Sequence, residues 1–402
     1  MAQIPLGTQF IGLASTYQTV ERRSALINNE SQPYTMQDII DTVGGGLEGT
    51  QYVFVAADGT DVENAAELQA AYVTAQGMSP SATNRITVIA APGNYNFSTD
   101  FVMNTQYIDL VSLDGNRSIV FNGSATLSIT ANDVFVKGVD VLTKNFKIAS
   151  SLNLLKVENC KGGNQSFGGQ GSTTVSGTFT NCIGGSSSFG GDFGIASGVF
   201  TNCTGAQFSF GGNAGIASGV FTNCTGGLGA FGGDPLGNTG GLANGTFNNC
   251  TGGDDSFGGT AEASGIFTDC TGGDTSFGSY GTASGTFTSC TGGYASFGAF
   301  SLASGTFTSC SGGEASFGGD GGEASGTFTS CLGGDISFGS YGIASGTFTN
   351  CIGGSGSFGG FGLGLDGKLY YCRLTSGSFE TVTSPGITRL CIDGNNVENN
   401  QG

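Results

Sequence analysis

The chain has 402 residues, of which 12 are basic and 30 acidic, and it contains no histidine, so its formal net charge is −18. Nucleic-acid binding requires lysine and arginine to neutralise phosphates, and anionic membrane surfaces attract the same residues. Because neither residue occurs between Lys161 and Lys368, and because no apolar run is long enough to span a membrane, we expect no nucleic-acid partner and no membrane insertion.

Residues 1–50 differ from the rest of the chain because they contain no repeat. Thr35-Met-Gln-Asp38 has the form of a helix capping box with Asp in place of Glu, and apolar residues follow it before the glycines at 44–46. This pattern predicts a short amphipathic helix followed by a hinge. A segment of this length cannot form its own core, so we interpret it as an attachment and oligomerisation segment, with a disordered terminus as the alternative.

Residues 51–159 contain short strands and one helix. We expect strands at Tyr52–Ala56 and Ile86–Ala91, and between them a helix from about 62 to 76, because Ala65, Leu68 and Tyr72 recur at helical spacing. Further strands are predicted at 107–113, 118–121, 126–129, 134–136 and 154–157. We interpret this part of the chain as the start of a coil stack, with irregular coils.

Residues 160–367 repeat one unit of about 20 residues, which is typical of a solenoid. A phenylalanine lies seven residues after each of the first eleven cysteines, and another lies three residues before Cys182 and each later cysteine as far as Cys351. The twelve cysteines are Cys160, Cys182, Cys203, Cys224, Cys250, Cys270, Cys290, Cys310, Cys331, Cys351, Cys372 and Cys391.

The constant spacing predicts three columns of side chains inside the coils. Phe179 and Cys182 are an odd number of residues apart, so a left-handed backbone at the intervening Asn or Ser is needed to turn both inward. The expected core ladders include Phe179 and Phe200, Phe189 and Phe210, and Cys182, Cys203 and Cys224. Thiols that point the same way on neighbouring strands cannot easily form disulfides, so we expect a ladder of free thiols, with paired disulfides as the alternative.

The order of these elements resembles the pectin-lyase-like right-handed parallel β-helix, a fold shared by many bacteriophage tailspikes and fibres. The residues that carry the resemblance are Asp58-Gly-Thr60, the helix, Ile86–Ile89, Pro92–Tyr95, and coils that contain Val157-Glu-Asn-Cys160 and Phe179-Thr-Asn-Cys182. The resemblance implies that the early helix covers the open end of the stack and that the corner asparagines stack as a ladder. Residues 1–50 also look like a virion attachment segment.

The resulting fold prediction is an all-β, single-stranded parallel β-helix (β-solenoid) with about 20 residues per coil, a short N-terminal helical segment and a capping helix. Residues 368–402 depart from the repeat because Leu369 replaces the first phenylalanine and Pro385-Gly386 interrupts the last coil. Since a solenoid needs an atypical terminal repeat, we interpret them as a C-terminal cap.

Two pairs of acidic residues raise the question of catalysis. Asp254 and Asp274 lie four residues after their cysteines, as do Glu314 and Asp335, and stacked coils would bring each pair to a separation that glycoside hydrolysis could use. A calcium ion that bridges them is a second interpretation. The alternative is that this outward position is simply variable, and that acidic residues there keep the glycine-rich rod soluble. We predict no catalytic residue and no resident metal, and calcium is the only cofactor considered.

Aromatic residues recur ten residues after the cysteines, beside the corner where coil length varies: Tyr280, Phe300, Tyr341 and Phe361. They could bind glycan by stacking on sugar rings, or they could form interchain contacts within an oligomer. We therefore expect a non-enzymatic phage fibre or spike on the surface of the virion. It would be made in the host cytoplasm because it has no signal sequence, attached to other virion proteins through residues 1–50, and homotrimeric by resemblance. A glycan depolymerase and a bacterial surface adhesin are the alternatives.

Overall fold

The computed structural model describes residues 11–12, 51–123, 125–142, 146–168, 171–233, 241–359, 364–377, 387–393 and 398–401. It confirms the predicted fold class, a parallel β-solenoid with about 21 residues per turn. The chain forms two compact units, one of Met1–Phe167 with Ser176–Ile183 and one of Gly168–Val175 with Gly184–Gly402. The helix predicted after Asp38 lies outside the described residues.

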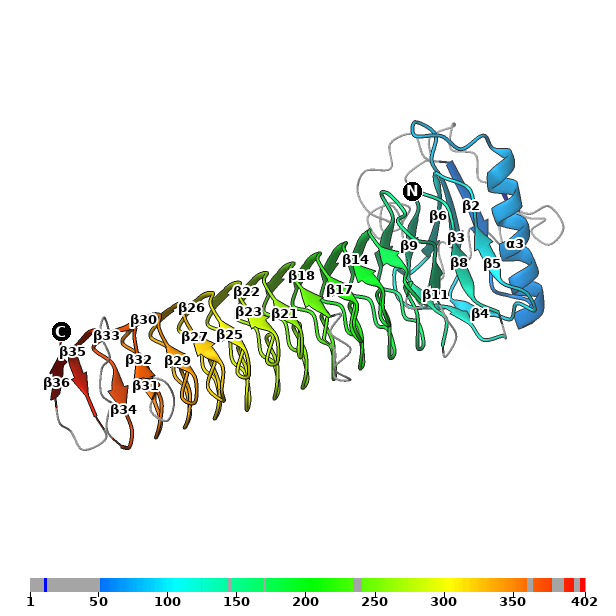
Figure 1. Cartoon of the computed structure of the whole chain (residues 1–402). Helices are drawn as coiled ribbons and strands as arrows, with labels where there is room; N and C mark the ends of the chain where they lie inside the picture. The colour runs from blue at the N-terminus through cyan, green and yellow to red at the C-terminus, as the bar shows by residue number, and fades with distance from the viewer. Residues whose placement is uncertain are drawn as a thin grey trace, which may run out of the picture. The chain divides into compact units, whose positions relative to one another are not determined.

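The N-terminal unit begins its coil stack with β2, whose residues pair in parallel with β3, and β3 pairs in turn with β6 (Figure 1). The seven strands predicted between 52 and 157 correspond to β2, β3, β6, β7, β8, β9 and β12 to within two residues, whereas β1, β4, β5, β10 and β11 were not predicted. The strands of this unit are β1 Ile11–Gly12, β2 Gln51–Val55, β3 Ile86–Ala90, β4 Gly93–Tyr95, β5 Phe101–Met103, β6 Ile108–Ser112, β7 Ile119–Phe121, β8 Leu127–Ile129, β9 Phe135–Lys137, β10 Val139–Asp140, β11 Phe146–Ile148, β12 Lys156–Glu158 and β14 Thr178–Thr180.

Helix α3 runs from Asp61 to Gly77 and covers one end of the coils of this unit (Figure 1). It begins with a capping box, in which Thr60 and Glu63 each bond the other's backbone N–H. Its buried face includes Leu68 and Tyr72, and the ring of Tyr72 meets Phe101 edge-on at 5.5 Å. The helix therefore shields the apolar interior of the first coils from water.

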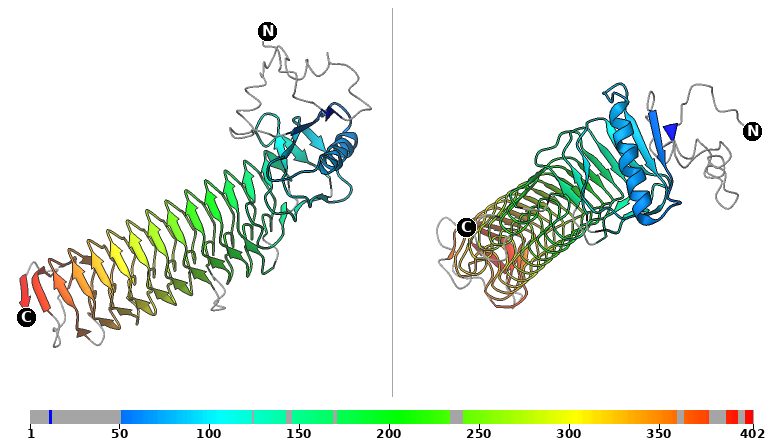
Figure 2. Two further views of the ribbon diagram at one scale, coloured as in Figure 1. Left: turned by 90° about the horizontal axis from the view of Figure 1, so that it is seen from above. Right: turned by 90° about the vertical axis from the view of Figure 1, so that its right-hand side faces the viewer.

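The C-terminal unit repeats two strands in every turn, and Figure 2 shows the strands of each kind lying side by side. The two-residue strands are β13 Thr174–Val175, β15 Ile195–Ala196, β17 Ile216–Ala217, β19 Leu242–Ala243, β21 Glu262–Ala263, β23 Thr282–Ala283, β25 Leu302–Ala303, β27 Glu323–Ala324, β29 Ile343–Ala344 and β32 Gly364–Leu365. The three-residue strands are β16 Val199–Thr201, β18 Val220–Thr222, β20 Thr246–Asn248, β22 Ile266–Thr268, β24 Thr286–Thr288, β26 Thr306–Thr308, β28 Thr327–Thr329, β30 Thr347–Thr349 and β33 Lys368–Tyr370.

Two phenylalanine columns fill the interior of this unit. Phe200 stacks on Phe221 with ring centroids 5.0 Å apart and planes 4° apart, and Phe189 stacks on Phe210 at 4.8 Å and 2°. Rings of the two columns meet edge-on, as Phe200 and Phe210 do at 83°. Phe179, Phe189, Phe200 and Phe210 are fully buried. Besides the two phenylalanine columns and the cysteine column, buried alanines such as Ala196 form a fourth column.

The corner before each cysteine has the predicted left-handed backbone. The φ angle is 54° at Asn181 and 53° at Ser289. Asn249 donates through Nδ2 to Oδ1 of Asn223 at 2.9 Å, and Asn223 donates to Asn202 at 3.1 Å, so the asparagine ladder implied by the resemblance is present. The same left-handed backbone occurs at Ser309 and Ser330, so the corner conformation that turns phenylalanine and cysteine inward does not depend on the asparagine bonds alone.

All twelve cysteines are free and buried, which confirms the thiol ladder and rules out the disulfide alternative in this structure. Their thiols donate to backbone carbonyls. Cys224, for example, lies 3.3 Å from the carbonyl oxygen of Phe200 and 3.4 Å from that of Thr222, and Cys182 and Cys203 make equivalent contacts. The cysteines therefore act as small buried side chains whose thiols donate hydrogen bonds to backbone carbonyl oxygens.

The last coils change the pattern at the C-terminal end. β31 Ile352–Gly353 pairs with β34 Arg373–Leu374, and β33 pairs with β35 Ile387–Ile392. β36 Glu398–Gln401 then pairs antiparallel with β35, with an irregular register between Thr388 and Cys391. This antiparallel strand ends the parallel stack in the region that the sequence predicted as a cap.

The phenylalanine columns predict a large loss of stability when one ring is removed. Phe287 stacks on Phe267 and Phe307, each at 4.8 Å, so Phe287→Ala should cost about 3–5 kcal/mol. Thr286→Ala, at the exposed neighbouring position, should change stability by less than about 0.5 kcal/mol. Urea denaturation followed by circular dichroism measures both, and equal midpoints for the two variants would contradict the proposed core.

The thiol ladder predicts that the native chain resists thiol reagents. Burial raises the pKa of Cys160 to about 12, and the other thiols are also closed to solvent. At pH 8 we therefore expect no rapid reaction with Ellman's reagent in the native state and reaction of all twelve thiols in guanidinium. Thr306→Cys places a thiol at an exposed position and should add one fast-reacting group. Rapid labelling of several native thiols would refute the closed interior.

Candidate functional site

The aromatic corner consists of Tyr280, Phe300 and Tyr341 in the C-terminal unit, and Phe361 lies outside the described residues. Tyr280 is 55% exposed and stacks on Phe300, with ring centroids 4.4 Å apart and planes 19° apart. Tyr341 is 51% exposed, but the equivalent position in the turn between it and Phe300 is Asp320. The structure thus brings two of the predicted residues into contact and separates the third from them by one turn.

Phe300 is the fixed half of the stacked pair. Its ring packs against the buried Ala295, Ala299 and Ala315, together with Ile336, while its backbone N–H donates to the carbonyl of Ser279 at 2.9 Å. Because these alanines leave space for a ring to lie flat, Phe300 is partly buried and the exposed Tyr280 rests on it. The pair therefore presents one well-supported aromatic face to solvent.

A glycine after each tyrosine allows the turns to approach closely at this corner. A Cβ on Gly281 would lie 1.7 Å from the carbonyl oxygen of Ala261, and a Cβ on Gly342 would lie equally close to that of Gly322. No side chain fits at that distance, so the residue after each tyrosine must be glycine. The glycine brings the backbones together and leaves the tyrosine ring outside.

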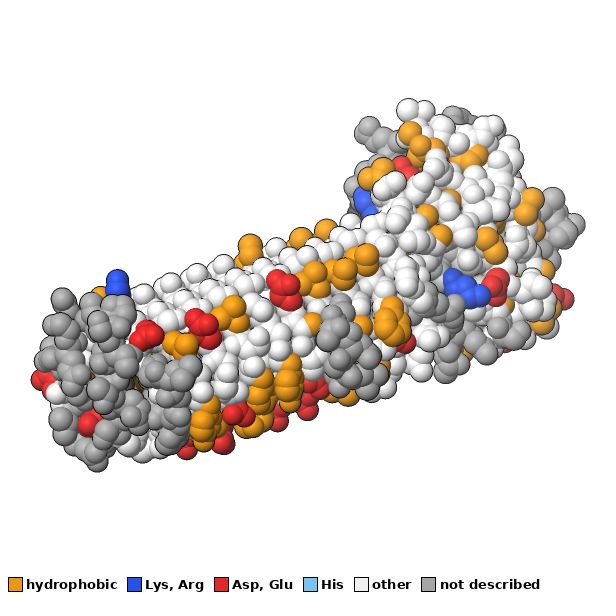
Figure 3. All heavy atoms as spheres, in the orientation of Figure 1, with side chains coloured by type: hydrophobic (Ala, Val, Ile, Leu, Met, Phe, Trp, Pro, Cys, Tyr) orange, Lys and Arg blue, Asp and Glu red, His pale blue; other side chains and the backbone are white. Residues whose placement is uncertain are grey.

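Tyr294 adds an aromatic residue that the sequence interpretation treated only as a variable position. It is 43% exposed, and its pKa is raised by desolvation and then by the negative charges of Asp320 and Glu314, with smaller effects from Tyr280 and Asp274. These residues therefore lie within electrostatic reach of one another. Figure 3 shows hydrophobic and acidic side chains interleaved along the lower edge of this unit.

The carboxylates considered for catalysis bond to the backbone of the next turn. Oδ1 of Asp254 accepts from the backbone N–H of Asp274 at 2.9 Å, and Oδ1 of Asp274 accepts from that of Tyr294 at 2.7 Å. Asp335 accepts from Ser355 in the same way at 2.7 Å. Three of the four predicted carboxylates thus have a structural partner along the axis, and no such contact involves Glu314.

Neither a metal cage nor a compensating cation accompanies these carboxylates. No group of three or more cysteine, aspartate and glutamate residues in the described ranges could hold a metal ion. The printed sequence has no lysine, arginine or histidine from 162 to 367, so the acidic residues of the repeats have no positive partner there. The surface around the aromatic corner is consequently negative, and we expect it to repel anionic ligands.

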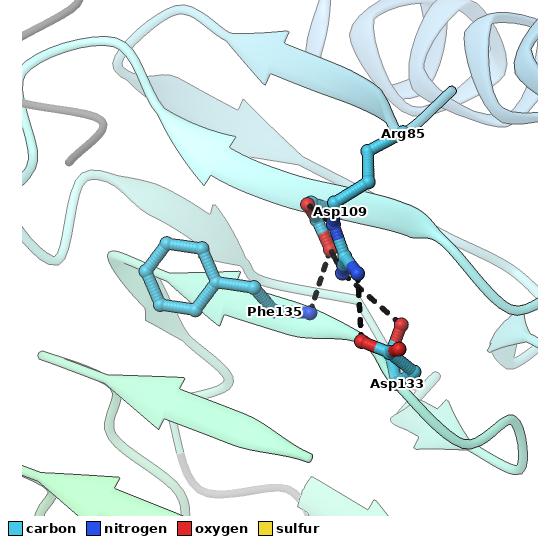
Figure 4. Close-up of polar contacts among 4 residues, drawn as sticks. All are labelled: Arg85, Asp109, Asp133 and Phe135. Carbon is cyan, nitrogen blue, oxygen red and sulfur yellow. Dashed lines mark hydrogen bonds and ion pairs between the residues drawn. The ribbon is translucent and has the colours of Figure 1, made fainter. Parts of the chain in front are cut away.

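A second polar cluster lies in the N-terminal unit, around Arg85 (Figure 4). The guanidinium binds Asp109 through two hydrogen bonds of 2.7 and 3.0 Å and contacts Asp133 at 2.6 Å, while Asp109 also accepts from the backbone N–H of Phe135. Burial raises the pKa of Asp109, although Arg85 opposes the shift. Since the cluster joins three successive turns and both carboxylates contact the one guanidinium, we interpret it as a structural clamp.

The sequence identified the positions of the aromatic corner but not the differences in exposure between its rings. The period identified Tyr280, Phe300 and Tyr341 as equivalent positions, whereas only Phe300 is partly buried, because it packs on a cluster of alanines. An aromatic residue at 294, where the two neighbouring turns have Asp274 and Glu314, was the available signal for Tyr294. The Arg85 cluster had no such signal, because Arg85, Asp109 and Asp133 belong to the non-repetitive coils.

The Arg85 clamp predicts a destabilised variant. Arg85→Ala leaves Asp109 buried without its partner, which should cost about 3 kcal/mol in the free energy of unfolding. Lys147→Ala removes an exposed ion pair with Asp100 and should cost less than about 1 kcal/mol. Urea titrations of both variants make the comparison, and an Arg85→Ala midpoint as high as that of Lys147→Ala would show that the clamp is unimportant.

The chain matches no protein-family model, no curated protein and no solved structure. No helix among the described residues is long and apolar enough to cross a membrane. The parallel β-solenoid expected from the resemblance is present in the strand pairing, and the phage identity stays a prediction.

Proposed function

We propose that this chain is a non-enzymatic structural protein of a phage particle, a β-solenoid appendage whose aromatic corner contacts a glycan on the host surface. The observation that carries this proposal is the stacked pair of Tyr280 and Phe300, which offers an exposed ring on a buried support. Aromatic faces are suited to the apolar faces of sugar rings, and a fixed ring loses little entropy on binding.

The charges around the aromatic corner limit the class of glycan. Asp274, Glu314 and Asp320 act on Tyr294, and residues 162–367 contain no basic residue. Uronic acids and phosphorylated sugars would be repelled, whereas neutral sugars and sugars with a free amine would not. We therefore propose a neutral or amine-bearing glycan as the ligand.

The carboxylate contacts favour binding over cleavage. Glycoside hydrolysis needs one carboxylic acid and one carboxylate with free access to substrate. Asp254, Asp274 and Asp335 each bond a backbone N–H of the next turn instead, which supports a structural role. The proposal also retains attachment to other virion proteins through residues 1–50 and a homotrimeric state, which light scattering on the full chain can test.

A glycan array tests the proposed contact. We expect the full chain to bind neutral or amine-bearing glycans and Tyr280→Ala to weaken binding by about tenfold, which corresponds to about 1.4 kcal/mol. Ile266→Ala removes an apolar side chain that is equally exposed but lies on β22, and it should leave binding unchanged.

Three outcomes would contradict the proposal. New reducing ends after incubation with host glycans would show that the chain is a depolymerase. Absence of binding to glycans and to host cells would indicate a purely architectural role. Equal losses in Tyr280→Ala and Ile266→Ala would show that the aromatic corner is not the site.

A further inference from the structure

The outward side of the three-residue strands carries a regular array of threonines. β24, β26, β28 and β30 each read Thr-Phe-Thr, with the phenylalanine buried and the two threonines outward. The strands pair in register, so Thr286 lies beside Thr306 and Thr288 beside Thr308. We call this surface the threonine face; its residues are Thr286, Thr288, Thr306, Thr308, Thr327, Thr329, Thr347 and Thr349.

The threonine face is flat, because successive turns are related by translation with almost no rotation. Phe287, beneath the face, stacks on Phe307 at 4.8 Å with planes 3° apart, and Phe307 stacks on Phe328 at 4.8 Å and 2°. Neighbouring strands in ordinary sheets rotate by about 20° to 25°. The buried rings thus hold the outward threonines in a two-dimensional lattice.

The lattice has two defined repeats. Equivalent residues lie 4.8 Å apart along the axis, as the stacked rings show. Alternate residues of one strand lie about 6.7 Å apart across it. Water oxygens on the prism face of hexagonal ice also form a rectangular lattice, and its two repeats are of the same order as these distances.

The side chains of the face are suited to ordered water. Threonine is β-branched and stiff at χ1, so its methyl and hydroxyl groups keep a fixed position at little entropic cost. Within the described part of the chain, these eight hydroxyls form no hydrogen bond to protein, and no residue of the face is charged. In earlier turns Val199, Val220 and Ile266 continue the exposed column with branched side chains.

We propose that the threonine face binds ice and restrains the growth of ice crystals. A rigid lattice of methyl and hydroxyl groups can hold water in positions that a growing crystal shares, and a flat face allows every turn to contribute at once. The proposal uses no residue of the aromatic corner, so it stands apart from the glycan contact.

Two other partners fit the face less well. A sugar chain usually needs an aromatic platform, and none of the eight residues is aromatic. A second copy could place its own face against this one because the repeats agree, but none of the eight residues is an aromatic, methionine or arginine residue of the kinds enriched in protein interfaces. The same set of variants distinguishes both alternatives from ice.

Ice recrystallisation and ice-affinity partitioning with the full chain test the proposal. At low micromolar protein we expect ice crystals to stay small and the protein to enter the growing ice. Thr306→Lys/Thr327→Lys places two charged side chains on the face and should raise the concentration needed for inhibition by about tenfold or more. Leu332→Lys/Ile352→Lys, at exposed positions of adjacent turns outside the face, is the matched control and should keep the activity.

Thermal unfolding by circular dichroism shows whether each variant is folded. If the lysine pair melts early, Thr306→Ser/Thr327→Ser removes the methyl groups at small structural cost and should still weaken inhibition. Crystal growth equal to that in buffer, or full activity in both face variants, would overturn the proposal. Binding to crystalline polysaccharide without an effect on ice would also overturn it, as would self-association that the lysine pair abolishes.

Discussion

The fold depends on one interaction, the stacking of each core side chain on its own equivalent in the next turn. Parallel strands lie about 4.8 Å apart, and aromatic rings can stack at nearly the same distance. A single translation therefore satisfies the backbone hydrogen bonds and the ring contacts, as the 4.8 Å spacing of Phe267, Phe287 and Phe307 shows. Rotation between turns would tilt the rings apart, so the aromatic columns also keep the solenoid flat.

The stacking also offsets a local cost in the backbone. From Phe189 to Phe358, the phenylalanines of one column have φ angles between 51° and 57°, a left-handed conformation that costs a residue with a side chain about 1–2 kcal/mol. Burial of a phenylalanine contributes about 1.5–3 kcal/mol, and an aromatic pair adds about 0.5–1.5 kcal/mol. Because both the burial and the stacking of the ring require neighbouring turns, one coil would not keep this conformation alone.

The sequence was sufficient to predict the structural features that repeat in every turn. It predicted the solenoid, the buried phenylalanine and cysteine columns and the left-handed corner at Asn181 and its equivalents, because every turn repeats the same residue types there. The left-handed backbone at Phe189 was not predictable, since phenylalanine gives no signal for it. Contacts between turns, such as Asp274 with the N–H of Tyr294, were equally invisible, because they depend on the axial position of a side chain whose residue type varies.

The same translation determines what the outer surface can bind. In an ordinary twisted sheet, equivalent outward residues fan away from one another, and only a few can meet one rigid partner. Here equivalent outward positions lie in straight columns. Where the same residue type recurs, as threonine does, the side chains form a lattice. Where the residue type varies, as at Tyr280, the side chain forms a local site. Asp254 and Asp274 each accept a hydrogen bond from the backbone of the next turn, and we expect their charge to repel anionic ligands. Because the core repeats without rotation, recognition depends on the pattern of outward side chains. The threonine face follows from a residue type that recurs, and the aromatic corner follows from one that varies.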